Sequence, residues 1–190
     1  AIPYLGDIPT SDANTQIIKS ESRTSSAEAL RIIRTNLEFM LSKVPENQAK
    51  TLFLTSTFSK EGKTFVSVNL AATFALSGKK VLLIGMDIRN PKLDDYVSLP
   101  DQGLTNYLSN KDIALEDLII KQKGYENFYI LPAGIIPPNP AELLLSQKVD
   151  TLFKTIKAQY DYIIVDTAPI SLVTDTLLIA KHADCFLFVI

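Results

Sequence analysis

Three nearly uninterrupted apolar runs constrain the fold of this chain more than any other sequence feature. They occupy residues 81–84, 162–165 and 185–190. A strand with one solvent-facing side alternates apolar and polar residues, whereas a continuous run indicates a strand that is buried on both faces. Strands of this kind occur in parallel sheets covered by helices. We therefore predict an α/β fold, with a mostly parallel sheet and helices on both faces.

The remaining segments predict an alternation of strands and helices. Pro3, Gly6 and Pro9 make residues 1–24 a linker or surface arm, and Ser25 and Glu28 have the spacing of a capping box at the start of a helix. The expected helices are 25–42, 63–77, short ones near 103–109 and 113–121, 140–158, and one near 174–182; the expected strands are 51–55, 80–84, 127–131, 162–166 and 184–190. Residues 25–190 should form one domain, which we expect to be incomplete at its C-terminal end because the sequence stops within an apolar strand.

Composition excludes several classes of function. The chain has 190 residues, and its 19 basic and 21 acidic side chains give a net charge of −2, so nothing marks it as a nucleic-acid binder. The single cysteine, Cys185, excludes an internal disulfide and a cysteine-based zinc site. Because no apolar run approaches the roughly 18 residues of a membrane helix, we expect this segment to be soluble.

Residues 51–64 have the order that a phosphate-binding loop requires. A short apolar strand leads through a polar loop into Gly62, Lys63 and Thr64, and an apolar helix follows. Backbone N–H groups at such a helix start can face an anion, a lysine can reach the outer phosphates, and a threonine hydroxyl can ligate Mg²⁺. The Walker A pattern places glycine where this chain has Thr57, so an ordinary helix-entry loop is the alternative.

Two acidic residues follow strands that should end at the same edge of the sheet. Asp87 comes shortly after strand 80–84, and Asp166 ends strand 162–166. Ligands of open parallel sheets bind at the carboxyl ends of the strands, and carboxylates there can hold Mg²⁺ directly or through water. Each aspartate alone is more simply a turn residue or a helix cap. Together with Lys63 and Thr64, they favour a Mg·ATP site.

These segments resemble the P-loop family of bacterial tyrosine kinases, the cytoplasmic kinase domains of capsule and exopolysaccharide assembly systems. Residues 56–64 are similar to the family's Walker A motif, residues 81–91 to its Walker A′ motif, and residues 162–169 to its Walker B motif. Residues 131–144 resemble its glycine- and proline-containing loop before a helix, and residues 1–9 resemble its juxtamembrane segment. The resemblance covers most of the chain and implies a P-loop NTPase fold.

The resemblance also implies an activity, cofactors and site residues. The implied reaction is ATP-dependent autophosphorylation of tyrosine that regulates capsule or exopolysaccharide synthesis and export, with ATP and Mg²⁺ as cofactors. Lys63, Asp87 and Asp166 would be catalytic, and Thr64, Asp87 and Asp166 would hold the metal. The implied nucleotide-binding residues are Ser59, Lys60, Glu61, Gly62, Lys63, Thr64, Phe65 and Arg89.

The implied partners are other copies of the chain and a membrane protein. Glu28, Arg31 and Arg34 match the segment through which the family forms rings, although their spacing alone favours a solvated ladder of charges on a helix. The substrate would be a tyrosine-rich tail of a neighbouring subunit. The expected location is the cytoplasmic face of the bacterial inner or plasma membrane, beside an activator domain supplied in the same or another chain.

Departures from the family pattern keep two alternatives open. Gly85 stands where the family usually has the first aspartate of Walker A′, so either Asp87 serves as the catalytic base or the kinase activity is weak. Proline is usual at Ser59. A nucleotide-switched ATPase of the MinD/ParA type is one alternative, but its second signature lysine is replaced here by Phe58. A scaffold that binds ATP without catalysis is the other, and Gly85 is its best support.

Overall fold

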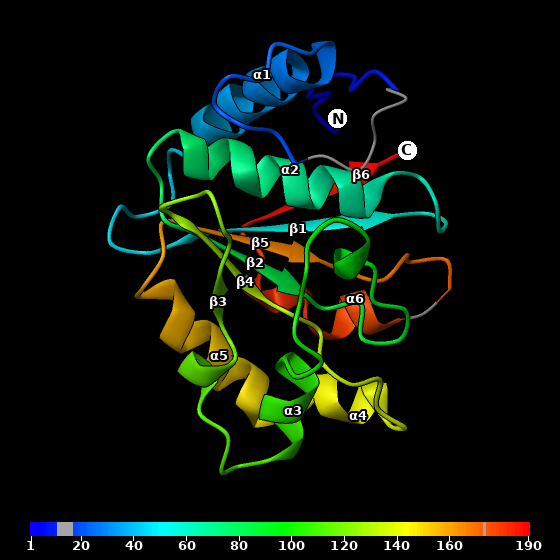
Figure 1. Ribbon diagram of the computed structural model, residues 1–190. Coiled ribbons are helices and arrows are strands. Elements are labelled where there is room, and N and C mark those ends of the chain that lie inside the picture. Colours follow the sequence, from blue (N-terminus) through cyan, green and yellow to red (C-terminus); the bar gives the residue numbers. More distant parts are fainter. Residues whose placement is uncertain (11–16, 173) are drawn as a thin grey trace.

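A six-stranded sheet forms the centre of the computed structural model, which describes residues 1–10, 17–172 and 174–190 (Figure 1). The strand order is β3-β4-β2-β5-β1-β6, and only β3 runs antiparallel to its neighbour. The predicted mostly parallel sheet is therefore confirmed. The strands are β1 Lys50–Ser56, β2 Val81–Gly85, β3 Ile120–Lys121, β4 Phe128–Leu131, β5 Tyr162–Asp166 and β6 Cys185–Val189.

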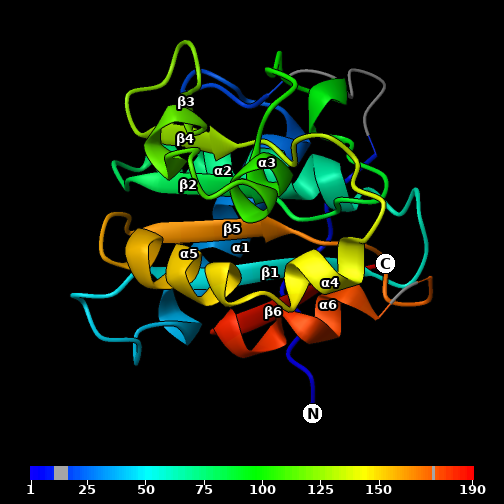
Figure 2. The ribbon, with the colours of Figure 1, turned by 90° about the horizontal axis from the view of Figure 1, so that it is seen from below.

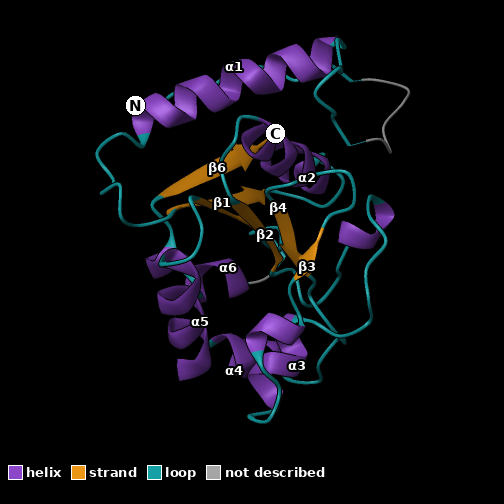
Figure 3. Cartoon of the chain, turned by 60° about the vertical axis from the view of Figure 1, so that its left-hand side comes forward, coloured by secondary structure: helices purple, strands orange, loops and turns teal. Residues whose placement is uncertain are grey.

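Helices cover both faces of this sheet. In Figure 1, α1 and α2 lie above the strands, while the other α-helices lie below them, as the view from that side also shows (Figure 2). Figure 3 shows α1 outside α2, as the outermost layer of the upper face. The α-helices are α1 Ser25–Met40, α2 Lys63–Leu76, α3 Leu104–Ser109, α4 Pro140–Leu144, α5 Gln147–Lys157 and α6 Asp175–Leu178; 3₁₀ turns occupy Leu93–Asp95, Leu115–Asp117 and Ala180–His182.

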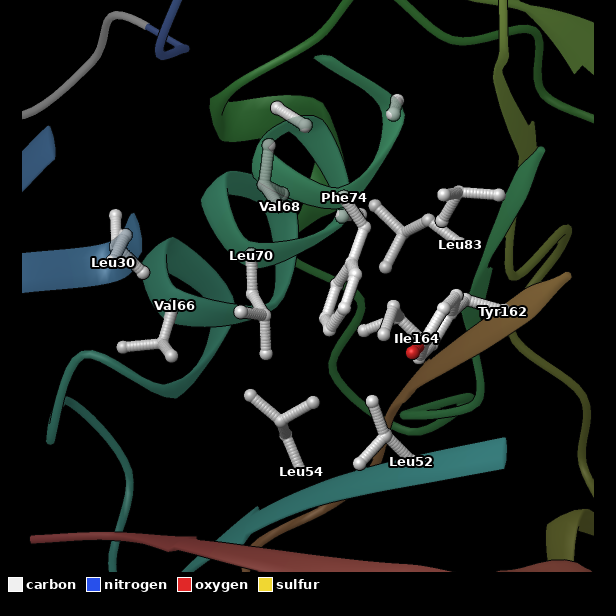
Figure 4. Packing of buried hydrophobic residues seen from close by; sticks show 14 of the residues in the cluster. Leu30, Leu52, Leu54, Val66, Val68, Leu70, Phe74, Leu83, Tyr162 and Ile164 are labelled. Atoms are coloured by element: carbon white, nitrogen blue, oxygen red, sulfur yellow. The ribbon is translucent and has the colours of Figure 1, made fainter. Parts of the chain in front are cut away.

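The continuous apolar runs supply both faces because successive side chains of a strand point in opposite directions. In β1, Leu52 and Leu54 belong to the core beneath α2, whereas Phe53 belongs to the core against α5. Phe74 of α2 points toward Tyr162 of β5 in Figure 4, and their stacked rings have centroids 4.1 Å apart. These contacts fix α2 on the sheet, and with it the loop that leads into α2.

Strand register brings the predicted site residues together. Within the parallel ladders, Asp166 of β5 is opposite Leu54 of β1 on one side and Gly85 of β2 on the other. The Met86 N–H also donates a hydrogen bond to the Asp166 carbonyl at 2.8 Å. The carboxyl ends of β1, β2 and β5 therefore lie at one edge.

Three predicted helices differ from the structure. The expected helix 140–158 is divided into α4 and α5, because the backbone of Ser146 is extended (φ −67°, ψ 150°) and Ser146 is the N-cap of a second helix. Serine is a common residue at that position. The expected helix 113–121 is a 3₁₀ turn followed by β3, which pairs with Tyr129 and Ile130 of β4. The expected helix 174–182 is α6 followed by a separate 3₁₀ turn.

The start of α1 also differs by one residue from the prediction. Thr24, rather than Ser25, is the N-cap, and its Oγ1 accepts a hydrogen bond from the Ala27 N–H at 3.2 Å. The capping box predicted between Ser25 and Glu28 is therefore wrong. Glu28 instead forms an ion pair with Arg31 on the next turn, at 2.7 Å.

Part of the predicted N-terminal arm packs against the domain. Residues 1–10 and 17–24 contain no helix or strand, and residues 11–16 of the arm lie outside the described residues. Ile18 is buried; its N–H donates to Asn69 Oδ1 at 2.9 Å, and its carbonyl accepts from Tyr125 Oη at 2.5 Å. The arm is thus joined to α2 and to the turn before β4. Among the helices in the described residues, none is both long and apolar enough to cross a bilayer.

The contact between Phe74 and the sheet gives a prediction about stability. Phe74 is fully buried, so Phe74→Ala should lower the free energy of unfolding by about 3–5 kcal/mol through lost burial and a cavity under α2. Urea denaturation followed by circular dichroism measures this change. Phe39→Ala, at an 82% exposed position on α1, is the control and should change the value by less than about 0.5 kcal/mol. Equal effects of the two substitutions would contradict the assigned packing.

Candidate active site

The loop between β1 and α2 presents unpaired backbone donors to solvent. Lys60 and Gly62 have positive φ values of 71° and 83°, and Gly62 precedes α2 without a side-chain cap. In the described part of the chain, the N–H groups of residues 60–65 have no protein acceptor. Such a turn at a helix start aims backbone donors and the positive end of the helix dipole at an anion. The predicted phosphate-binding geometry is therefore present without glycine at position 57.

The front half of this loop is held by its own side chains. Glu61 Oε2 accepts a hydrogen bond from the Phe58 N–H at 2.9 Å, and Ser56 Oγ donates to the Phe58 carbonyl at 2.7 Å. Glu61 was predicted to bind nucleotide, but its carboxylate is engaged in this turn. Its side chain therefore shapes the loop.

Asp166 joins the end of β5 to the first turns of α2. Its Oδ1 accepts from Lys63 Nζ at 2.6 Å and is 3.0 Å from Ser67 Oγ, while its Oδ2 accepts from Thr64 Oγ1 at 3.0 Å. The Lys63 and Asp166 side chains are only 7% and 2% exposed. A buried carboxylate needs such charged and polar partners, because an unpaired charge in the interior is strongly destabilising. The structure thus brings together the lysine, threonine and aspartate that the sequence singled out.

Asp87 is the second buried carboxylate at this edge. It is 8% exposed, and its Oδ1 accepts a hydrogen bond from the Asn90 N–H at 3.1 Å. Burial raises the pKa of the Asp87 carboxyl, the negative charge of Asp166 adds to this effect, and Lys63 opposes it. A raised pKa brings a carboxylate closer to the range in which it can accept a proton from a substrate.

A cavity of about 430 Å³ opens beside the loop. Asp87 and Arg89 line it from the segment after β2, and Tyr96 lines it near Phe65, their ring centroids being 6.3 Å apart. Of the eight predicted nucleotide-binding residues, all except Glu61 line this cavity: Ser59, Lys60, Gly62, Lys63, Thr64, Phe65 and Arg89. Its size and its mixture of donors, positive charges and aromatic rings suit a nucleotide.

A second cavity, of about 260 Å³, shares Asp87 with the first. Asp87 and Asp166 line it together with Gly85, Leu93 and Ala133. Asp87 lines both cavities. This arrangement suits transfer between two substrates.

Gly85 lines the smaller cavity and is closely surrounded by its neighbours. A Cβ atom built on Gly85 would lie 3.0 Å from Leu93 Cδ1 and 3.1 Å from the Ala133 backbone nitrogen. The space of a first Walker A′ aspartate is therefore partly filled by its neighbours. A glycine therefore fits at position 85, where a larger side chain would press on Leu93 and Ala133.

The oxygen ligands at this edge fit a magnesium ion. The Thr64 hydroxyl and both carboxylates are hard oxygen donors, and Mg²⁺ takes only one or two carboxylates beside water and phosphate oxygens. A divalent cation would also offset the cost that burial and the neighbouring Asp166 charge place on ionised Asp87. No group of three His, Cys, Asp or Glu side chains in the described residues forms an all-protein metal cage.

Two residues at the site were missed by sequence reasoning. Ser67 contacts Asp166 one turn after Lys63, and its signal was a polar residue on the same helix face as Lys63 and Thr64. Asp175 of α6 binds Arg89 through two hydrogen bonds, at 2.6 and 3.0 Å. Nothing in the sequence connects those two residues, which are 86 positions apart.

The predicted interface residues lie apart from this site, on the outermost helix α1. Arg31 pairs with Glu28 and also donates to the Ser22 carbonyl at 2.7 Å, while Arg34 Nε lies 3.8 Å from Glu38 Oε1. Arg31 thus has the partner that the charge ladder considered above would give it, whereas Arg34 lies near Glu38 and its side chain is only 24% exposed. The ring interface stays a prediction.

Comparison with known proteins agrees with the site. A family described as an AAA domain matches residues 59–190. Tyrosine-protein kinase YwqD of Bacillus subtilis is 38% identical over 175 residues, which are 92% of this chain and 72% of YwqD. Tyrosine-protein kinase Wzc of Salmonella typhi is 37% identical over 85% of this chain, but the match spans only 22% of Wzc.

Solved structures give the same relationship. The BceF tyrosine kinase domain superposes with a TM-score of 0.85 and 31% identity, covering 98% of this chain and 79% of that domain. MinD of Pyrococcus horikoshii, solved with Mg-ADP, superposes with a TM-score of 0.62 and 26% identity over 74% of this chain and 57% of MinD. The fold is thus that of P-loop NTPases, and the MinD-like proteins are more distant. The chain belongs to the bacterial tyrosine kinase family.

Proposed function

We propose that this domain transfers the γ-phosphoryl group of Mg·ATP to a tyrosine hydroxyl, within a system that regulates capsule or exopolysaccharide synthesis. The observation that carries the proposal is the convergence of Lys63, Thr64 and Asp166 beside a cavity that Asp87 also lines. Similarity to proteins named tyrosine-protein kinases supports the choice of acceptor. The place in polysaccharide synthesis rests on the family resemblance.

The chain's own residues account for most of the chemistry. The N–H groups of residues 60–65 and the Lys63 ammonium would hold the phosphates, and Thr64, Asp87 and Asp166 would hold Mg²⁺, which neutralises phosphate charge when bound. Asp87 would accept the tyrosine proton while the tyrosine oxygen bonds to the γ-phosphorus and the bond to the ADP oxygen breaks. The place of Asp87 in the lining of both cavities supports its use as this base.

Several tyrosines of the chain are poor acceptor candidates. Tyr125, Tyr160 and Tyr162 are partly or fully buried, and burial raises the pKa of each to about 12. Their packing supports the proposal that the acceptor is a tyrosine-rich tail of a neighbouring subunit. We further propose that rings formed through α1 bring that tail to the site, at the cytoplasmic face of the membrane and beside an activator domain.

A scaffold that binds ATP without transferring phosphate is the second candidate. The close packing around Gly85 favours it, because the usual first Walker A′ carboxylate is missing and cannot simply be added. Phosphotyrosine mass spectrometry with Mg·ATP, set beside measurement of released inorganic phosphate, separates the candidates. A kinase gives phosphotyrosine, a MinD/ParA-type ATPase gives phosphate release alone, and a scaffold gives neither.

Lys63 provides a direct test of the kinase proposal. Lys63→Met should abolish autophosphorylation, because the phosphates lose their charged partner. Phosphotyrosine is measured by mass spectrometry on the full-length protein, and a melting curve checks that the variant folds, since Asp166 also loses a buried partner. Lys79→Met, at an exposed lysine, is the matched control and should retain activity. Phosphotyrosine retained in folded Lys63→Met would overturn the proposed mechanism.

Assembly can be tested on α1. Reversing the charges of Arg31 and Arg34 to glutamate should shift a ring toward monomer, and light scattering measures the mass. Reversal of Lys43, which is exposed just beyond α1, serves as the control and should leave the mass unchanged. An unchanged mass in the Arg31 and Arg34 variant would leave these residues as a solvated ladder.

Gly85 gives a prediction about packing. Gly85→Ala should lower the free energy of unfolding by about 1–3 kcal/mol, because its Cβ would press on Leu93 and on the backbone of Ala133. Denaturant titration measures the loss, and the same substitution should cost less in a Leu93→Ala background, where the nearest contact is removed. Equal losses in the two backgrounds would show that Leu93 does not limit the space.

A further inference from the structure

We propose that Asp175 is a positioning residue that holds the Arg89 guanidinium at the wall of the nucleotide cavity, so that Arg89 meets the phosphates in a fixed orientation. The proposal rests on nucleotide binding in the larger cavity, as set out above. It assigns Asp175 no contact with the nucleotide.

The contact has the geometry of an orienting clamp. Arg89 Nε donates to Asp175 Oδ2 at 2.6 Å, and Nη2 donates to Oδ1 at 3.0 Å. Two parallel hydrogen bonds between a planar guanidinium and a carboxylate restrict rotation as well as distance. A single point contact would leave the guanidinium free to turn.

Burial identifies which partner orients the other. The Asp175 side chain is 4% exposed, while that of Arg89 is 41% exposed. The buried carboxylate needs a charged partner, so it retains Arg89, whereas Arg89 alone could remain solvated. The asymmetry makes Asp175 the fixed member of the pair.

The segment that carries Asp175 is itself fixed to the phosphate-binding side of the sheet. Thr176 Oγ1, next to Asp175, donates to the Ala168 carbonyl at 2.9 Å. The Ile170 N–H donates to the Ser56 carbonyl at the end of β1, at 3.0 Å. Asp175 therefore sits on a support that is tied to the same strand end as the phosphate-binding loop.

Arg89 keeps donors that can meet a ligand. Its guanidinium carries five N–H groups, and Asp175 occupies two of them. Within the described residues the guanidinium has no acceptor besides Asp175, and Arg89 lines the cavity together with Lys63 and Thr64. The pair with Asp175 thus leaves one edge of the guanidinium available for a phosphate.

A binding cycle tests this role without depending on kinase activity. We expect Asp175→Asn to raise the Kd for a non-hydrolysable ATP analogue with Mg²⁺ about 10-fold, because a misaligned guanidinium loses charge-assisted hydrogen bonds to the phosphates. Arg89→Ala should raise it at least as much. In the Arg89→Ala background, Asp175→Asn should add less than about 2-fold, since residues that act through one another are not additive. Isothermal titration calorimetry on the full chain gives all four values.

Controls separate orientation from folding. Asp150→Asn breaks an exposed ion pair with Lys181 and should leave the Kd unchanged. Arg89→Lys keeps a positive charge for Asp175 but not the fork, and should weaken binding as Arg89→Ala does. It also serves as the test if Asp175→Asn fails to fold.

The possible outcomes are distinct. An unchanged or lower Kd in Asp175→Asn, an equal loss in the Arg89→Ala background, or full binding by Arg89→Lys would each overturn the positioning role while leaving the proposed function intact. Failure of the wild-type chain to bind nucleotide would overturn the proposed function itself. Nucleotide binding without phosphotyrosine would remove the kinase proposal and still leave the Asp175 test valid.

Discussion

The burial of the Asp166 carboxylate is the constraint on which the site depends. A charge at the end of a central strand is tolerated only with partners, and all three of its side-chain partners come from the start of α2. The first turns of α2 are therefore fixed over the end of β5, while Phe74 and Tyr162 fix its other end on the sheet. The same contacts aim the helix N-terminus at the larger cavity.

The register of the parallel strands determines which other segments lie beside the phosphate-binding loop. Gly85 and Asp166 are neighbours in register, so the segment after β2 must leave the sheet beside the phosphate-binding loop. That segment carries Asp87 and Arg89 into the larger cavity, and the segment after β5 carries Asp175 up to Arg89. Three strand ends thus contribute a loop of free backbone donors, a buried carboxylate and an arginine–aspartate pair.

The sequence allowed prediction of the features that depend on local pattern and on sheet topology. Continuous apolar runs predicted the parallel strands, and the rule that ligands bind at carboxyl ends predicted that Lys63, Asp87 and Asp166 would meet. Features that depend on distant contacts were not predicted. The strand β3 exists because it pairs with β4, and Ser146 divides a helix that its periodicity would continue. The Arg89–Asp175 pair has no local signal at all.

The Ser67 hydroxyl has two acceptors within reach, which affects how the site can accommodate a change of charge. Its hydroxyl carries one proton, yet it lies 2.9 Å from the Lys63 carbonyl and 3.0 Å from Asp166 Oδ1. It can therefore donate to only one of them at a time. If a cation were bound by the Asp166 carboxylate and the Lys63 ammonium contacted a phosphate, the Ser67 hydroxyl could still donate its hydrogen bond to the Lys63 carbonyl. The interior can thus exchange one set of partners for another without leaving that hydroxyl unpaired.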